Sequence, residues 1–259
     1  PYMLAEKPNV LMHKFIDDYI KLFPNISKEA SLHYIKSNQR FDELTDLWYQ
    51  YLHEGDIDGA YSVYNDDYYF TDMWNCFKIY SRRYLRDVYR PCLLNGRSIL
   101  EETSPASCVL DIGCGVGYTT AALTGMYPNA DVYGLNLRGT KQWDFCERMA
   151  IDYKFKMIDS INAIPTNVDV LFASEYFEHI LEPIKHLTEI VQKLNPKYFI
   201  IANAFNTRSI GHFISYQTSL TTLEGTNKVP VDQKLISKMF NKNIKNLGYE
   251  RVKTSLFNN

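Results

Sequence analysis

Hydrophobic positions change their spacing near residue 105, and the change divides the chain into two parts. Before it, apolar residues recur every three or four positions, which is typical of amphipathic helices. Ser27 is a suitable N-cap for one of these helices, and Pro91 ends another. We therefore expect residues 1–104 to form a helical N-terminal region that selects the substrate and covers the site as a lid. The predicted helices span residues 10–23, 27–37, 40–53 and 71–90.

After residue 105, short runs rich in β-branched residues alternate with helical stretches. Alternation of strand and helix favours parallel strands joined by right-handed crossovers. The pattern predicts an α/β fold in which residues 105–259 form a doubly wound, Rossmann-like sheet of about seven strands. The predicted strands contain CVLDI, DVYGL, FKMI, VDVLFA, YFIIANAF and YERVKTSLF, and the predicted helices span residues 118–126, 140–151, 183–194 and 232–247.

Composition narrows the class of protein. The 28 basic and 30 acidic residues give a net charge of −2, so no global positive field attracts nucleic acid or an anionic membrane. No apolar run approaches the roughly 18 residues that a membrane span needs, and the first residues lack the apolar stretch of a signal peptide. The five cysteines show neither CxxC nor zinc-type spacing. We expect a cytoplasmic protein with no membrane span and no disulfide framework.

The segment VLDIGCGVGYTT carries the strongest candidate chemistry. Asp111 lies at the end of a predicted buried strand, and Gly113, Gly115 and Gly117 lead into a helix. Glycine allows a ligand to approach the backbone closely, and ligands of doubly wound sheets bind at such strand ends. The dinucleotide fingerprint GxGxxG fails because Tyr118 occupies its third glycine position, and no glycine-rich turn ends in GK[ST]. NAD and nucleoside triphosphates are therefore disfavoured.

The remaining pattern, Asp-x-Gly-x-Gly-x-Gly, resembles motif I of the class I S-adenosylmethionine-dependent methyltransferases. The resemblance extends over about residues 107–257 and implies S-adenosyl-L-methionine as the cofactor. It places the backbone from Gly113 to Gly117, with Cys114, along the methionine part of the cofactor. Asp111 would orient either this turn or the ammonium group of the cofactor.

The same resemblance implies further cofactor contacts at the ends of the next predicted strands. Asn136 stands where the family usually has an Asp or Glu that binds both ribose hydroxyls, and this departure removes a charge. Asp159 stands where the family commonly has an acid that accepts from the adenine amine; capping a helix or turn is the alternative role. The implied contacts in this part of the chain are Asn136, Leu137, Asp159, Ser160, Ser174 and Glu175.

An acidic group follows the fourth predicted strand of this region. Glu175, Glu178 and His179 have the spacing i, i+3 and i+4, which puts them on one face of a helical turn. The segment resembles that of ubiquinone-biosynthesis-type O-methyltransferases and of small-RNA ribose 2′-O-methyltransferases. In both groups such residues hold a divalent metal, which implies that these three residues bind Mg²⁺ or another divalent cation. Three roles stay open: metal ligands, catalysis by His179 as general base with Glu178, or a structural role. His212 is the second candidate base.

Two basic stripes and one aromatic stretch bear on the acceptor. Both stripes suit either an anionic ligand or a solvated helix face. The aromatic stretch at residues 60–74 suits either a lid over a planar acceptor or packing on the sheet. We expect methyl transfer to a small-molecule acceptor at oxygen; the alternatives are a nucleic-acid-directed methyltransferase, acting on a ribose hydroxyl or a modified base, and a noncatalytic cofactor-binding subunit. The stripes consist of Arg82, Arg86 and Arg90, and of Lys234, Lys238 and Lys242.

Overall fold

One parallel sheet organises the computed structural model, which describes residues 3–82, 85, 98–164, 167–222 and 225–251. Its strand order is β3-β2-β1-β4-β5. Strand β1 is central and fully buried, with Leu110 opposite Tyr133 on one side and Leu171 on the other. Strand order reverses between β1 and β4, and ligands of doubly wound sheets bind at such a point. The strands are β1 (Cys108–Ile112), β2 (Asp131–Leu135), β3 (Lys156–Ile158), β4 (Val170–Ser174) and β5 (Tyr198–Ala202).

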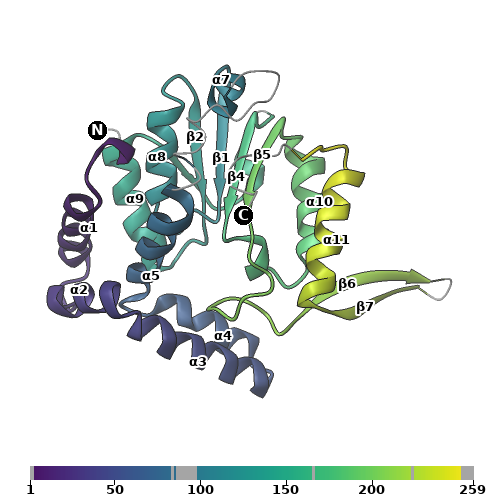
Figure 1. Cartoon of the computed structure of the whole chain (residues 1–259), viewed down its shortest axis with the longest axis horizontal. Helices are drawn as coiled ribbons and strands as arrows, with labels where there is room; N and C mark the ends of the chain where they lie inside the picture. Colours follow the sequence, from purple (N-terminus) through teal and green to yellow (C-terminus); the bar gives the residue numbers. More distant parts are fainter. Residues whose placement is uncertain (1–2, 83–84, 86–97, 165–166, 223–224, 252–259) are drawn as a thin grey trace.

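Helices cover both faces of this sheet. Figure 1 shows α8 and α9 on one side and α10 and α11 on the other. The expected doubly wound α/β fold is thereby confirmed, whereas a seven-stranded sheet is not: the described part of the sheet has five strands. The last predicted strand covers residues 249–257, of which 249–251 are not in a strand and the others lie outside the described residues. The helices are α8 (Tyr118–Met126), α9 (Lys141–Tyr153), α10 (Pro183–Leu194) and α11 (Gln233–Asn246).

A separate antiparallel hairpin lies between β5 and α11. It consists of β6 (Ser215–Thr222) and β7 (Gly225–Asp232), and Figure 1 shows it extending beyond the sheet. The sequence reasoning assigned no strands here. At its base, Tyr216 is fully buried against Phe205 and Phe213, so the hairpin is anchored to the core.

The N-terminal residues form helices, as expected. Helix α5 continues into a π-helical turn, η3 (Phe77–Ser81), and the rest of the helix predicted to reach residue 90 lies largely outside the described residues. In Figure 1, α3 and α4 lie across the end of the sheet at which the parallel strands finish. The helices are α1 (Pro8–Leu22), α2 (Lys28–Ser37), α3 (Gln39–Glu54), α4 (Ile57–Ser62), α5 (Tyr69–Cys76) and α7 (Ile99–Thr103).

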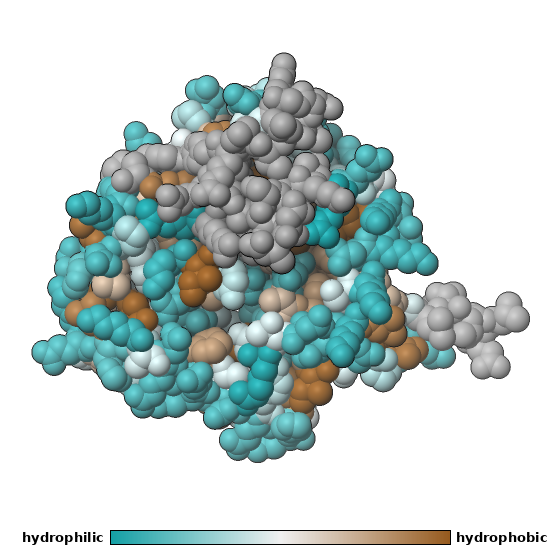
Figure 2. Space-filling model, in the orientation of Figure 1, coloured by the Kyte–Doolittle hydropathy of each residue, from teal (hydrophilic) through white to brown (hydrophobic). Residues whose placement is uncertain are grey.

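The hydrophobic core joins the N-terminal helices to the sheet. Phe15 of α1 packs on Tyr118 of α8 with ring centroids 4.7 Å apart. Trp48 of α3 is fully buried and packs on Phe213, just before β6, at 5.7 Å. On the face shown in Figure 2, apolar residues form small groups among hydrophilic ones. No helix in the described part of the chain has the length and apolar character needed to cross a membrane.

Candidate functional site

A cavity opens where β1 and β4 end. It contains about 660 Å³ of space, part of it open to solvent. The glycine turn forms one wall with the segment from Gly113 to Val116, and α5 forms another. Further lining residues come from the end of β4 and from the loop before β6. The lining from α5 and η3 consists of Tyr69, Asp72, Met73, Cys76, Phe77 and Ser81, and the loop before β6 contributes Ser209, Ile210 and His212.

The glycine turn has a backbone shape that depends on its glycines. Gly113, Gly115 and Gly117 have φ angles of 72°, 56° and 89°, a region that a Cβ disfavours. A Cβ on Gly113 would lie 2.2 Å from Cδ2 of Tyr176, and one on Gly115 would lie 3.0 Å from Cε of Met73. The turn is therefore in close contact with neighbouring segments, as well as exposing backbone to the cavity.

Asp111 supports this turn from behind. Its carboxylate is buried and accepts a hydrogen bond from Oγ1 of Thr120 at 2.7 Å. Burial raises the pKa of the Asp111 carboxyl to about 7. Because Thr120 lies in the first turns of α8, this bond connects the end of β1 to the helix that follows the turn. Cys114 lines the cavity, with its Sγ 3.7 Å from Sγ of Cys146.

The side chains predicted to bind the ribose and the adenine form hydrogen bonds and an ion pair with other residues of the chain. Nδ2 of Asn136 donates to the carbonyl oxygen of Gly115 at 2.7 Å, and the Leu137 amide donates to Oδ1 of Asn136 at 2.8 Å. Asp159 pairs with Arg138 at 3.2 Å. Ser160 caps a short 3-10 turn, η4 (Ile161–Ala163). The cavity lining that the structure describes includes none of these four predicted residues.

The acidic segment after β4 is not the single helical turn that the spacing predicts. Glu175 has a left-handed φ of 51°, and helical geometry begins only with the 3-10 turn η5 (Phe177–His179). Glu175 and His179 line the cavity together with Ser174. Glu178 is fully buried, and its Oε1 accepts from the Ala204 amide at 2.7 Å. The backbone bend at Glu175 therefore separates two residues that face the cavity from one that faces the core.

Glu175 and Glu178 nevertheless interact through their carboxyl groups. Burial raises the pKa of Glu175 to about 7 and holds that of Glu178 well above its ordinary value, and the proximity of Glu175 adds to the shift of Glu178. Two buried carboxyls this close do not ionise independently. Burial and proximity therefore both favour the protonated form of this pair.

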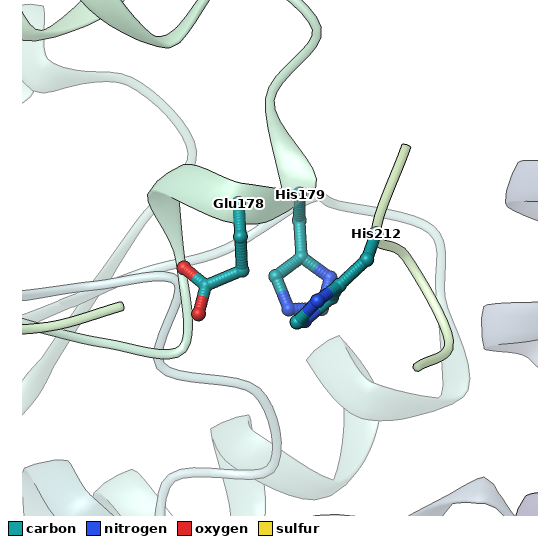
Figure 3. A group of neighbouring side chains, drawn as sticks. All are labelled: Glu178, His179 and His212. Carbon is teal, nitrogen blue, oxygen red and sulfur yellow. The ribbon is translucent and has the colours of Figure 1, made fainter. Parts of the chain in front are cut away.

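His179 and His212 come together although 33 positions separate them in the sequence. Their ring centroids are 5.0 Å apart and their planes nearly perpendicular, at 87° (Figure 3). One potential ligand atom from each of Glu178, His179 and His212 lies within 4.8 Å of the others. The predicted metal set named Glu175 with Glu178 and His179; the structure instead groups His212 with the latter two. His212, the second candidate base, is buried.

Hydrogen bonds fix the orientation of both imidazoles. Nδ1 of His179 lies 2.6 Å from the hydroxyl of Tyr64, and Nδ1 of His212 donates to the carbonyl oxygen of Thr207 at 2.8 Å. Burial lowers the pKa of both rings, that of His212 to about 4. Both imidazoles are therefore neutral at pH 7. A neutral imidazole can accept a proton or bind a metal ion.

Aromatic side chains from three other segments hold the backbone of this cluster. Trp48 Nε1 donates to the carbonyl oxygen of His212 at 2.9 Å. Tyr61 donates to that of His179 at 3.2 Å, and Tyr216 to that of Glu178 at 2.8 Å. The sequence indicated Tyr61, which lies in the aromatic stretch at residues 60–74. Trp48 and Tyr216 had no such signal, because their partners are far away in the sequence.

The other predicted substrate contacts are dispersed. Tyr69 lines the cavity, whereas Trp74 packs in the core on Phe77 and Tyr118. Arg82 donates to the carbonyl oxygens of Leu4 and Glu6, away from the cavity. Arg86 and Arg90 lie outside the described residues, and Lys234, Lys238 and Lys242 are exposed on α11.

Comparisons with known proteins bear on this site. Residues 110–202 match a family model described as a methyltransferase domain. The trans-aconitate 2-methyltransferase of Rhodopseudomonas palustris (strain BisB5) is 33% identical over 86 residues, which cover 33% of this chain and 34% of that protein. The ubiquinone biosynthesis O-methyltransferase of Cereibacter sphaeroides (strain KD131 / KCTC 12085) is 30% identical over 101 residues, 38% of this chain and 41% of that protein.

These matches span between a third and about two fifths of the relatives' lengths. Among solved structures, the plantazolicin methyltransferase BpumL in complex with a pentazolic desmethylPZN analog and SAH aligns with a TM-score of 0.44. It is 18% identical, and the alignment covers 63% of this chain and 61% of that one. The family model and the two relatives confirm the resemblance on which the cofactor expectation was based.

Proposed function

We propose that the chain is a class I S-adenosylmethionine-dependent methyltransferase, and that the methyltransferase domain matched at residues 110–202 transfers a methyl group to an oxygen atom of a small molecule. The observation that carries the proposal is the cavity between the glycine turn and the pair Glu175 and His179. One of the two relatives is named as an O-methyltransferase, which favours oxygen as the acceptor atom. We assign residues 105–259 to the cofactor-binding domain and residues 1–104 to the selection and covering of the acceptor, with α5 of the first part also lining the cavity.

The reaction requires a nucleophile in line with an electrophilic sulfonium methyl group in a site poor in water. The glycine turn is the proposed seat of the methionine part of the cofactor, with Asp111 and Asn136 holding the shape of that turn. His179 is the proposed general base. In the tautomer whose Nδ1–H donates to Tyr64, Nε2 keeps a lone pair for the proton of an acceptor hydroxyl.

Binding and transfer assays test this proposal. Titration calorimetry with S-adenosylmethionine and S-adenosylhomocysteine should show binding to the full chain. Methyl-labelled cofactor is then offered with panels of phenols, carboxylic acids, amines and RNA. We expect labelled product from an oxygen acceptor, and a roughly 100-fold lower kcat in His179→Gln, the loss expected without a general base. Product only from amines or RNA would overturn the acceptor assignment, and binding without any transfer would favour a noncatalytic subunit.

The alternative that we propose for His179 is a role as a metal ligand, in which Glu178, His179 and His212 together hold a divalent cation. The donor chemistry fits, because two neutral imidazoles and a carboxylate are common ligands of such ions. Each ligand residue has an outer partner: Ala204 for Glu178, Tyr64 for His179 and Thr207 for His212. A bound cation would lower the pKa of an acceptor hydroxyl. This role excludes His179 Nε2 as the base, since one lone pair serves only one of the two.

Metal analysis separates the two roles of His179. We expect the purified chain to contain close to one equivalent of a divalent metal by elemental mass spectrometry, and His212→Gln to contain much less. Chelation should then abolish methyl transfer, and added Mg²⁺ or another divalent ion should restore it. Activity that is indifferent to exhaustive chelation would refute the cation and leave His179 as the base.

A further inference from the structure

Helix α5 places one carboxylate, Asp72, in the cavity wall that faces the glycine turn. On the basis of the proposed function, we infer that Asp72 is a cofactor-positioning residue whose carboxylate binds the cationic end of S-adenosylmethionine. That end carries two positive groups, the ammonium and the sulfonium. Asp72 was not predicted as a site residue, because it lies on a helix outside the glycine turn and outside the acidic segment after β4.

The first support is the lack of a counter-charge for Asp72. The described residues that line the cavity include Asp72 and Glu175 but neither lysine nor arginine. The hydrogen bond made to the Asp72 carboxylate comes from the thiol of Cys76, with Sγ 3.9 Å from Oδ2, and a thiol is a weak donor. Burial raises the pKa of Asp72 to about 7. A carboxylate in such surroundings gains from a cationic ligand because the ligand supplies the missing charge.

The second support is the closeness of α5 to the glycine turn. Met73, the next residue after Asp72, has its Cε 3.0 Å from the position of a Cβ on Gly115. The same stretch of helix therefore contacts the turn on which the methionine part of the cofactor is proposed to lie. Glu175, the other acid in the lining, follows β4 and does not belong to this helix. Asp72 is thus the carboxylate that the described lining places on the helix in contact with the glycine turn.

Ligands of different charge test the assignment directly. S-Adenosylmethionine carries both positive groups, S-adenosylhomocysteine retains only the ammonium, and 5′-methylthioadenosine carries neither. In titration calorimetry on the full chain, we expect Asp72→Asn to bind S-adenosylmethionine roughly tenfold more weakly or worse, the range of a charge-assisted contact. The loss should be smaller for S-adenosylhomocysteine and absent for 5′-methylthioadenosine. Asp72→Glu, which keeps the charge, should recover part of the preference for the cationic ligands.

A matched control and a folding check accompany these variants. Asp144→Asn removes the same charge from an exposed position on α9, and all three affinities should stay unchanged. Asp72→Asn removes a buried charge at constant shape, so its melting temperature should be no lower than that of the wild type. Unchanged affinity for S-adenosylmethionine in Asp72→Asn would overturn the inference, and so would an equal loss for all three ligands. A wild-type chain that binds none of them would instead refute the proposed function.

Discussion

His179 and His212 stay uncharged at neutral pH because burial lowers the pKa of both rings. His212 is 1% exposed, and its Nδ1–H is bound to the Thr207 carbonyl. Protonating it would bury a charge beside another imidazole. The lone pairs of the two rings are therefore present at physiological pH. This property suits either a base or a metal ligand.

The lowered pKa of His212 predicts how its contribution to stability depends on pH. The pKa is about 4 in the folded chain against an ordinary value of 6.5, so the unfolded chain binds the proton more readily between these values. The contribution is present above pH 6.5 and is lost as the pH falls towards 4, by about 3 kcal/mol in the limit. Urea titrations in the presence of a chelator measure this effect. The free energy of unfolding of the wild type minus that of His212→Asn should be lower at pH 4.5 than at pH 7.5.

Comparison with the variant cancels the opposite trend from Asp72 and Asp111. Their pKa values are raised to about 7 from 3.8, so the folded chain binds their protons more readily and is destabilised as the pH rises towards 7. A difference between wild type and His212→Asn that does not vary with pH would show that His212 is not held neutral.

Gly211 limits the space around the same histidines. It has a φ of 81°, and a Cβ there would lie 1.9 Å from Nδ1 of His179 and 2.0 Å from the hydroxyl oxygen of Tyr64. Gly139 has the same φ with nothing within 4 Å of its Cβ position. Gly211→Ala should lower the free energy of unfolding by about 2 kcal/mol more than Gly139→Ala, which has only the backbone cost. Equal costs in urea denaturation would mean that the histidine and tyrosine side chains move aside freely.

Some residues of the candidate site could be predicted from the sequence, and others could not. The glycines at 113, 115 and 117 were recognisable because a turn with positive φ angles imposes its own residue type. The grouping of His212 with Glu178 and His179 was not, since it depends on Trp48 and Thr207, whose contacts exist only after folding. Glu175 was placed on a helical face because regular spacing conceals a single residue with left-handed backbone.

Elements with strong local signals were predicted closely. The segments 108–112, 131–135, 118–126 and 183–194 match β1, β2, α8 and α10 residue for residue. Their apolar periodicity is uninterrupted, and a glycine turn or a proline marks the start of each of the two helices. The hairpin was missed because β6 consists mostly of serine and threonine with few apolar residues, which gives a weak core-facing pattern. Among the hairpin residues whose burial the structure describes, Tyr216 and Val231 are the buried ones.

Strand β6 supports the site through one hydroxyl group. Tyr216 donates to the carbonyl oxygen of Glu178, and both residues are fully buried. Tyr216→Phe should lower the free energy of unfolding by about 1–2 kcal/mol, because it leaves a buried carbonyl without this donor. It should also weaken metal retention, since it loosens the turn that carries Glu178 and His179.

Tyr198→Phe is the matched control for this variant. Tyr198 on β5 donates to a side chain, Glu102, at 3.1 Å and is only half-buried. It should cost less than 1 kcal/mol and leave the metal content unchanged. An equally small cost for Tyr216→Phe would show that the hairpin does not stabilise the site.

The whole molecule has a core to which both parts of the chain contribute. One cluster joins Phe15, Tyr19 and Trp74 to Tyr118 and Phe145, and a second joins Trp48 to Phe213 and Tyr216. Removing residues 1–104 would expose large aromatic surfaces of the sheet and its helices. The proposed division at residue 105 is therefore one of roles within a shared core.

This shared core predicts the behaviour of a truncated chain. Residues 105–259 alone should lack cooperative unfolding and fixed tertiary packing, because the apolar area normally covered by α1, α3 and α5 is lost to solvent. Near-ultraviolet circular dichroism measures the tertiary packing, and urea titration measures the cooperativity of unfolding. Both are recorded for the truncated chain and for the full chain. A truncated chain that unfolds cooperatively with native-like aromatic signals would contradict the prediction and establish the second part as self-sufficient.

The position of Met73 against the glycine turn has a consequence for biosynthesis of the protein. One wall of the cavity is made early by the ribosome and the other more than thirty residues later. A chain translated only as far as α5 therefore has one wall of the cavity without the other. A ligand of this cavity can bind only after the glycine turn, β4 and the loop before β6 have been made and have packed together.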